Sequence, residues 1–147
     1  MGNIASFSAN SQSGRFVIGD PCYVLPDDIY YDVWEELYNF QPGTVKVDNS
    51  SFAVINTSMD FSAEGVSGSE YAVDSGSFAV IAYELCDSEK MNDNRNLIKI
   101  VPGHVATIEH DADNETIYVF IDEQDEPVET IYYGYDDTYD ENEDWEQ

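Results

Sequence analysis

The stretch TVKVDNSSFAVINTSM, residues 44–59, predicts two β-strands joined by a turn at Asp48-Asn49. Its apolar and polar residues follow the two-residue period of a strand, and Asp and Asn are common turn residues. The segment DNSSFAVI at 48–55 also has a counterpart, DSGSFAVI at 74–81. Two copies are too few for a repeat architecture, so we expect two equivalent strands of one sheet.

More strand segments lie on both sides of this pair. A run of β-forming residues at 14–25 is interrupted by Gly19-Asp20-Pro21, which predicts a turn. The other expected strands are a long apolar segment at 71–85, two strands around a Pro-Gly turn within 97–110, and single strands at 116–122 and 128–136. Asp-rich turns separate the last three strands, which is typical of an antiparallel meander.

One main helix is expected at residues 27–40. Asp at its start can accept the free N–H groups of the first turn, and Pro42-Gly43 ends it. The helical period gives an apolar stripe of Ile29, Val33, Leu37 and Phe40, and a solvent side of Asp28, Asp32, Glu35 and Glu36. The polar segment 86–96 is expected to be a loop with room for a short helix.

The predicted fold class is therefore α+β: a twisted antiparallel sheet or partly open barrel, with the helix at about 27–40 packed on it. We expect a flexible polar leader at 1–13, a single domain at 14–135 and an acidic tail at 136–147. No run is long and apolar enough for a membrane span, and the first residues lack the features of a secretory signal. The expected location is the cytoplasm.

The charge of the chain is its most unusual property. Thirty-one acidic residues face five basic ones, which gives a net charge of −26 and an isoelectric point near 4.1. Sixteen of the acids follow Lys99, and no base does. Solubility alone needs a net charge of only about 2 to 8 in a small domain. Direct nucleic-acid binding is excluded, because Lys and Arg make the contacts with phosphates.

The residues that could carry catalysis or bind a metal form weak patterns. Asp111, Asp113 and Glu115 have the spacing of a calcium-binding loop, but the glycine required next is Thr116, so we expect a hairpin turn. Cys22 and His104 could form a nucleophile and base, although no local signature supports this. The expectation is two reduced thiols, no catalytic residue, no metal and no cofactor.

The acids themselves suggest imitation of a nucleic acid. A compact chain of this length has a diameter of about 38 Å, and duplex DNA of that length carries about 22 charges. This is close to the net charge of −26. The tail also contains aromatic residues, which a merely solvating tail does not need.

The residues expected to bind the partner are therefore acids from the second half of the chain, aromatic anchors in the tail and, secondarily, the helix acids. They are Asp111, Asp113, Glu115, Asp122, Glu123, Asp125, Glu126, Asp136, Asp137, Asp140, Glu141, Glu143 and Asp144, with Tyr135, Tyr139 and Trp145, and Asp28, Asp32, Glu35 and Glu36.

The segment GRFVIGDPCYVLPDDIYYDVW, followed by YAVDSGSFAVIAYEL, resembles small uncharacterised phage and bacterial proteins with a GDPCYV strand-turn and a later VDSG strand. This resemblance implies no activity. By charge and size the chain also resembles the DNA-mimic inhibitors of phages, the anti-restriction and anti-CRISPR proteins. That likeness implies a basic nucleic-acid-binding host partner, such as a nuclease, CRISPR effector, restriction enzyme or polymerase.

Two other function classes stay open at this stage. The chain could be an immunity-type or regulatory inhibitor that binds a basic partner without imitating DNA. It could also be a small β-domain enzyme or metal-binding module that uses Cys22 and His104. Whether it forms a homodimer is also open.

Overall fold

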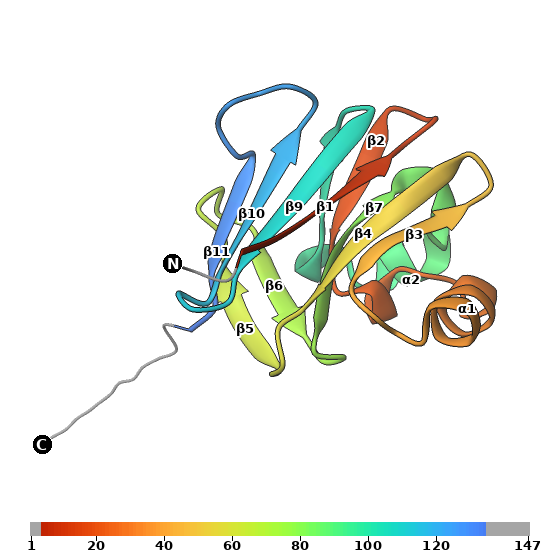
Figure 1. The fold of residues 1–147 in the computed structure, drawn as a ribbon, viewed down its shortest axis with the longest axis horizontal. Coiled ribbons are helices and arrows are strands. Elements are labelled where there is room, and N and C mark those ends of the chain that lie inside the picture. Colours follow the sequence, from red (N-terminus) through yellow and green to blue (C-terminus); the bar gives the residue numbers. More distant parts are fainter. Residues whose placement is uncertain (1–3, 135–147) are drawn as a thin grey trace, which may run out of the picture.

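The computed structural model describes residues 4–134, which form two antiparallel sheets, a β-hairpin and short helices (Figure 1). Sheet A has the strand order β1 (Ile4–Asn10), β9 (Val105–Asp111), β10 (Thr116–Ile121), β11 (Glu129–Tyr132). Sheet B has the order β3 (Gly43–Val47), β4 (Ser50–Asn56), β7 (Ser77–Ala82), β2 (Arg15–Gly19), β8 (Lys99–Pro102). The α+β prediction is confirmed.

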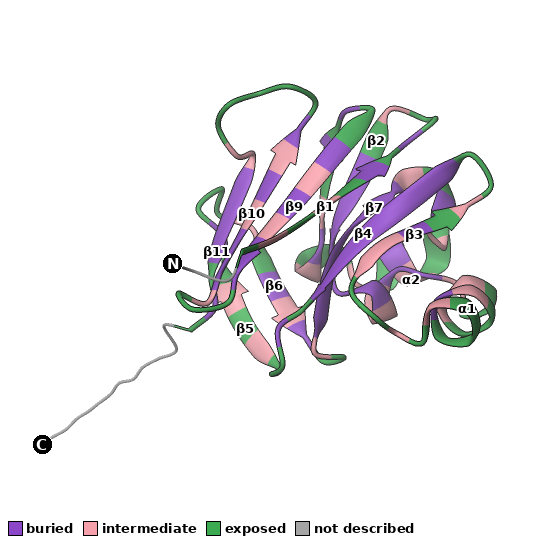
Figure 2. Ribbon diagram, in the orientation of Figure 1, coloured by how far each residue is buried: buried purple, intermediate pink, exposed green. Residues whose placement is uncertain are grey.

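The centre of sheet B is built from the two similar segments of the sequence. Strands β4 and β7 pair antiparallel, with Phe52 opposite Ile81 and Ile55 opposite Phe78. Every residue of β7 is buried, as is every residue of β4 except the last (Figure 2). The predicted turn at Asp48 is also present, with a positive φ of 57°. The expectation of two equivalent strands in one sheet is confirmed.

The core lies between the two sheets and is continuous. Sheet B supplies fully buried aromatic side chains such as Phe16 and Phe78, and sheet A supplies Ile108, Ile117 and Ile131. Strand β1 joins the sheets at one side, because Thr44 Oγ1 donates a 2.7 Å hydrogen bond to the Ser8 carbonyl.

The prediction of a flexible leader at 1–13 is wrong for the described residues. Residues 4–10 form β1, which pairs with β9 along its whole length. Its inward side chains are Ala5, Phe7 and Ala9, and the outward ones are mostly small and polar. Apolar and polar residues do alternate along this segment. The pattern is weak because most of these side chains are small, so it did not predict a strand.

Two other sequence predictions need correction. The expected long strand at 71–85 is divided into β6 (Glu70–Val73) and β7 by a turn at 74–76, and it ends in a short helical turn, η3 (Tyr83–Leu85). The two strands around Pro102-Gly103 belong to different sheets, since β8 pairs with β2 and β9 pairs with β1 and β10. Gly103 fits the crossing because a Cβ there would collide with the Ile121 side chain.

The main helix is present but has a wider turn than an α-helix. It comprises η2 (Asp28–Glu35), which has π-helical geometry, and one α-helical turn, α1 (Glu36–Tyr38). Leu37, expected on the buried stripe, is 71% exposed, whereas Trp34 is only 2% exposed. The other stripe residues, Ile29, Val33 and Phe40, do pack against the core. Bonds from residue i to i+5 add residues to each turn, which moves Leu37 off the buried face that a 3.6-residue period predicts.

Three smaller elements complete the fold. Strand β5 (Phe61–Glu64) pairs with β6 as a hairpin beside β11, where Val66 N donates a 2.9 Å hydrogen bond to Thr130 O. Helix α2 (Ser88–Asp93) lies within the segment expected to be a loop and is capped by the Asp87 carboxylate. The turns η1 (Pro21–Tyr23) and η4 (Arg95–Leu97) flank β2 and β8. Within residues 4–134, no helix is long and apolar enough to cross a bilayer.

Candidate interaction surface

The outward side of sheet A is a mainly uncharged surface that carries aromatic and hydroxyl side chains. The strand register places its members in rows across the four strands, and Ser8 Oγ lies 3.0 Å from Thr107 Oγ1 in one such row. Tyr132 is 43% exposed. We call this surface the outer face of sheet A; it comprises Ile4, Ser6, Ser8, Val105, Thr107, Glu109, Tyr118, Phe120, Thr130 and Tyr132, of which Thr130 is buried.

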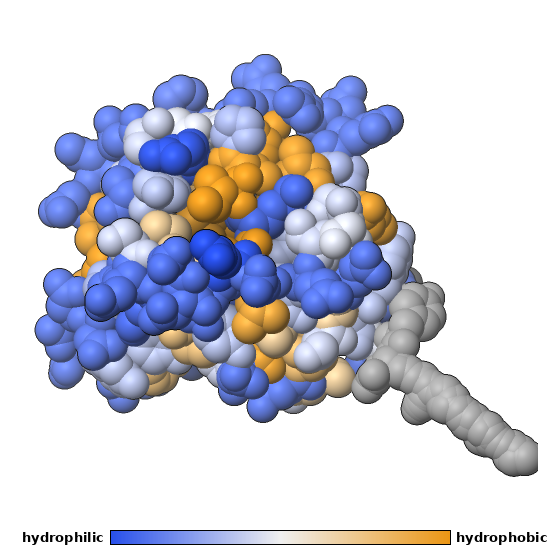
Figure 3. Space-filling view, turned by 180° about the vertical axis from the view of Figure 1, so that it is seen from behind, coloured by the Kyte–Doolittle hydropathy of each residue, from blue (hydrophilic) through white to orange (hydrophobic). Residues whose placement is uncertain are grey.

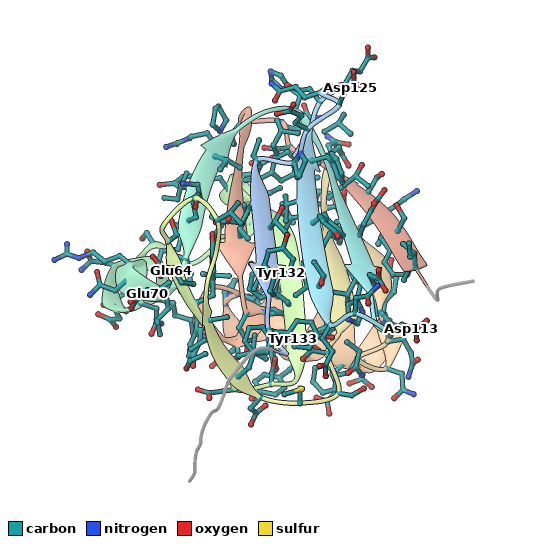
Figure 4. All side chains as sticks on the ribbon, turned by 90° about the vertical axis from the view of Figure 1, so that its left-hand side faces the viewer. Glu64, Glu70, Asp113, Asp125, Tyr132 and Tyr133 are labelled. Carbon is teal, nitrogen blue, oxygen red and sulfur yellow. The ribbon has the colours of Figure 1, made fainter. Side chains whose placement is uncertain are left out.

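Exposed carboxylates border this face on three sides (Figure 4). Asp113 lies in the β9–β10 turn at one end of the strands, and Asp125 lies in the β10–β11 loop at the other end. Glu64 and Glu70 lie on the β5–β6 hairpin at the side, with Tyr132 between these groups. The arrangement is a mainly uncharged centre, which contains the half-buried Glu109, with an acidic rim.

The carboxylates of Glu64 and Glu70 stand opposite each other in the hairpin register. Directly opposed like charges destabilise an antiparallel pair by up to about 1 kcal/mol. Both residues line a hollow of about 280 Å³, together with Tyr71 and Leu97. A cationic side chain with an apolar stem would relieve this repulsion.

The predicted acids at 111–115 and 122–126 do not form one row. The two turns lie at opposite ends of β10, a six-residue strand, and are therefore about 20 Å apart. Glu123, Asp125 and Glu126 are exposed in the β10–β11 loop. Asp122 is exposed too, but its carboxylate accepts hydrogen bonds from the backbone N–H groups of His104 and Val105.

Asp111 and Glu115 belong to the hairpin turn that the sequence predicted in place of a calcium loop. Asp111 is buried and accepts hydrogen bonds from the backbone N–H and side-chain amide of Asn114. Glu115 is half-buried, and its carbonyl accepts a 3.0 Å bond from Tyr133 N. Both residues hold the turn in shape, which leaves Asp113 as its exposed acid.

The remaining predicted partner-binding residues lie elsewhere. Asp28, Asp32, Glu35 and Glu36 are exposed on the main helix, which packs beside sheet B, away from the outer face of sheet A (Figures 1 and 2). The tail residues Tyr135, Asp136, Asp137, Tyr139, Asp140, Glu141, Glu143, Asp144 and Trp145 lie outside the described residues.

Sequence reasoning missed three acids that serve the fold. Asp20, Glu84 and Glu129 each accept several hydrogen bonds from loops that are distant in sequence. Glu129 is fully buried, and its carboxylate accepts bonds from Ser67 N and from the Tyr71 hydroxyl at 2.6 Å. It fixes the β5–β6 hairpin to sheet A, and Gly65 is required there because a Cβ would collide with this carboxylate.

Asp20 connects the GDPCYV and VDSG segments of the chain. It is fully buried in GDPCYV, and its carboxylate accepts bonds from the N–H groups of Asp74 and Ser75, the Ser75 hydroxyl and Cys22 N at 2.7–2.9 Å. Asp74 and Ser75 are the centre of VDSG. One buried carboxylate therefore holds both turns together in this fold.

The proposed catalytic pair is not assembled. His104 lies next to Gly14, before the start of β2, while Cys22 follows the other end of that strand, which puts them at least about 17 Å apart. Burial raises the pKa of the Cys22 thiol and the Asp20 carboxylate raises it further, which disfavours the reactive thiolate. Cys22 and Cys86 are both free thiols. Across residues 4–134, no three His, Cys, Asp or Glu side chains are placed to share a metal ion.

His110 has a structural environment. It is buried, and its Nε2 lies 2.6 Å from the hydroxyl of Tyr133, whose ring stacks on Phe61 at 4.8 Å. Burial lowers the pKa of this histidine. The cluster secures the end of β11 against the β5–β6 hairpin.

No protein-family model matches this chain, and no curated protein or solved structure is significantly similar to it.

Proposed function

We propose that this protein binds a basic protein that normally holds DNA or RNA and occupies the surface where the nucleic acid would lie. The observation that carries this proposal is the outer face of sheet A with its acidic rim. Tyrosines are common among the residues that dominate binding energy, and the uncharged side chains that make up most of the centre can be desolvated at low cost. The rim carboxylates would pair with Lys and Arg of the partner.

The total charge supports a partner of the nucleic-acid-binding class. Five bases can neutralise only a small part of 31 acids, so the field around the molecule is strongly negative. Such a field accelerates association with a basic surface and weakens as salt is added. A phage-encoded inhibitor acting in the cytoplasm of a bacterial host fits this chemistry.

A second candidate function is inhibition of a basic protein without imitation of DNA. It is favoured by the separation of the described acids into groups at both ends of β10 and at the β5–β6 hairpin. A duplex presents a continuous row of phosphates, about 1.7 Å of axis per charge. Competition with DNA distinguishes the two functions, because only a nucleic-acid competitor must be displaced by duplex DNA.

The first experiment captures the partner from a bacterial lysate with the full-length protein at about 50 mM and about 300 mM salt. Binding to the purified partner is then measured for the variant Glu123→Gln/Asp125→Asn/Glu126→Gln. We expect affinity to fall at least about tenfold, since three rim carboxylates are removed. Duplex DNA should displace the wild-type protein.

The matched control is Asp32→Asn/Glu35→Gln/Glu36→Gln on the main helix, which removes the same charge from another side of the molecule. It should lower the association rate slightly and leave the dissociation rate unchanged. Equal effects of the two triple variants on dissociation would contradict the proposed surface. Failure of DNA to compete, with the surface confirmed, would favour the second candidate function.

A further inference from the structure

A groove on the other side of the molecule has a character opposite to that of the acidic surface. It has a volume of about 400 Å³ and lies between α2 and the edge strand β8. Met91, Ile98, Ile100 and Tyr83 give it an apolar lining. Viewed from behind, the space-filling structure shows an apolar patch in the middle of this face (Figure 3). The outer face of sheet A and its rim contribute no residue to this lining.

Strand β8 has one edge beside this groove that pairs with no other strand of residues 4–134. It is the last strand in the order of sheet B, with β2 as its partner. Ile100, in the middle of β8, is 47% exposed and lines the groove. An edge strand with an exposed apolar side chain is a template for an added strand.

The groove also holds scarce positive charge. Arg95 lines it, and the Arg15 guanidinium lies 3.8 Å from the centre of the Tyr83 ring, another part of the lining. These are two of only five bases in the chain. A carboxylate placed here would meet the Arg95 guanidinium, with Arg15 on the adjoining Tyr83 ring, on a surface that otherwise repels anions.

We propose that this groove binds an extended peptide of a partner protein. The peptide adds a strand to β8, inserts an apolar side chain between Met91 and Ile100, and presents a carboxylate to Arg95. Main-chain hydrogen bonds to an edge strand supply affinity in this mode, and the adjoining hollow supplies specificity. The protein would then have two separate binding surfaces, one for a basic partner and one for an acidic, apolar peptide.

The test selects peptides that bind the full-length protein from a random nonapeptide library displayed on phage. The selection is made at about 300 mM salt, because salt weakens the binding of basic peptides to the acidic surface. We expect enrichment of peptides with alternating apolar residues and at least one acid. A selected synthetic peptide should shift the methyl NMR signals of Met91, Ile98 and Ile100. Methylation of its alternate backbone nitrogens should abolish binding, because it blocks strand addition.

Matched variants locate the site. Arg95→Glu and Ile100→Asp should each weaken the selected peptide by at least about tenfold. Lys46→Glu on β3 and Val105→Asp on the outer face of sheet A make the same changes elsewhere and should leave affinity within about twofold. Selection of only basic peptides, or equal losses in both pairs of variants, would overturn the proposal and leave the acidic surface unaffected. A further arm adds 2-naphthoate, a small aromatic carboxylate. If it shifts the methyl NMR signals of the groove but the library gives no binding peptide, the proposal is overturned and the groove is assigned to small anions.

Discussion

Asp20 shows how one acid in a highly acidic chain can belong to the core. Its carboxylate is fully buried and accepts bonds from three backbone N–H groups and one hydroxyl. The buried Asp20 carboxylate needs these donors, because a buried charge without hydrogen-bond partners costs more than a single hydrogen bond contributes. The GDPC and VDSG turns therefore depend on each other.

Replacing Asp20 with Asn should destabilise the fold by about 2–4 kcal/mol, because an amide group would face N–H donors and one acceptor oxygen would be lost. The measurement is the free energy of unfolding in urea. Asp48→Asn, in an exposed turn with positive φ that Asn tolerates, is the control and should change it by less than about 0.5 kcal/mol. Equal effects of the two substitutions would remove the structural role assigned to Asp20.

Glu84 makes stability depend on pH in a predictable direction. Burial by itself would raise its pKa, but hydrogen bonds from Ser13, Ser50 and Gln12 N lower it from 4.5 to about 2. The folded state therefore favours the ionised carboxylate. Its contribution is complete above the unfolded value of 4.5 and is lost as the pH falls toward 2.

The test compares the wild-type protein with Glu84→Gln in urea unfolding from about pH 6 to about pH 2. We expect a difference of about 1 kcal/mol at neutral pH, kept small by the partly exposed position, and almost none at the acidic end. Glu123→Gln is the control for a solvated acid. A difference that stays constant with pH would show that ionisation of Glu84 does not matter.

At the scale of elements, local sequence predicted the type of structure better than its exact geometry. The β4 and β7 segments were recognised as strands of one sheet because both are continuously apolar and similar in sequence. The main helix was recognised too, and Ile29, Val33 and Phe40 of its expected stripe pack against the core, whereas Leu37 does not. Trp34, which was not predicted to be buried, packs with Tyr30 and Phe40 at 4.8–5.4 Å.

The outer face of sheet A was not recognised, although every one of its strands except β1 was expected. Alternation along a strand says which residues share a face, but the neighbours across the sheet depend on strand order and register. Tyr118 and Thr130 lie in one row only because β10 and β11 pair in this register. The candidate site is therefore a product of pairing and could not be derived from single strands.

For the molecule as a whole, the net charge of −26 opposes folding through mutual repulsion. Raising sodium chloride from about 10 mM to about 500 mM should increase the melting temperature by several degrees, since screening reduces this repulsion. The triple variant Glu123→Gln/Asp125→Asn/Glu126→Gln should melt higher at low salt and gain less from added salt. A melting temperature that does not change with salt would show that the repulsion is negligible.

The sequence by itself determined the charge, the α+β class, the antiparallel strands and the hairpin turn at 111–115, because composition and short-range periodicity set these properties. Tertiary structure alone decided which acids are exposed on a rim and which are buried as hydrogen-bond acceptors. Asp20 and Asp125 are the same residue type in similarly polar local sequence, yet one is fully buried and the other exposed. The difference arises from donors far away in the chain, and only the folded arrangement brings those donors within hydrogen-bonding distance.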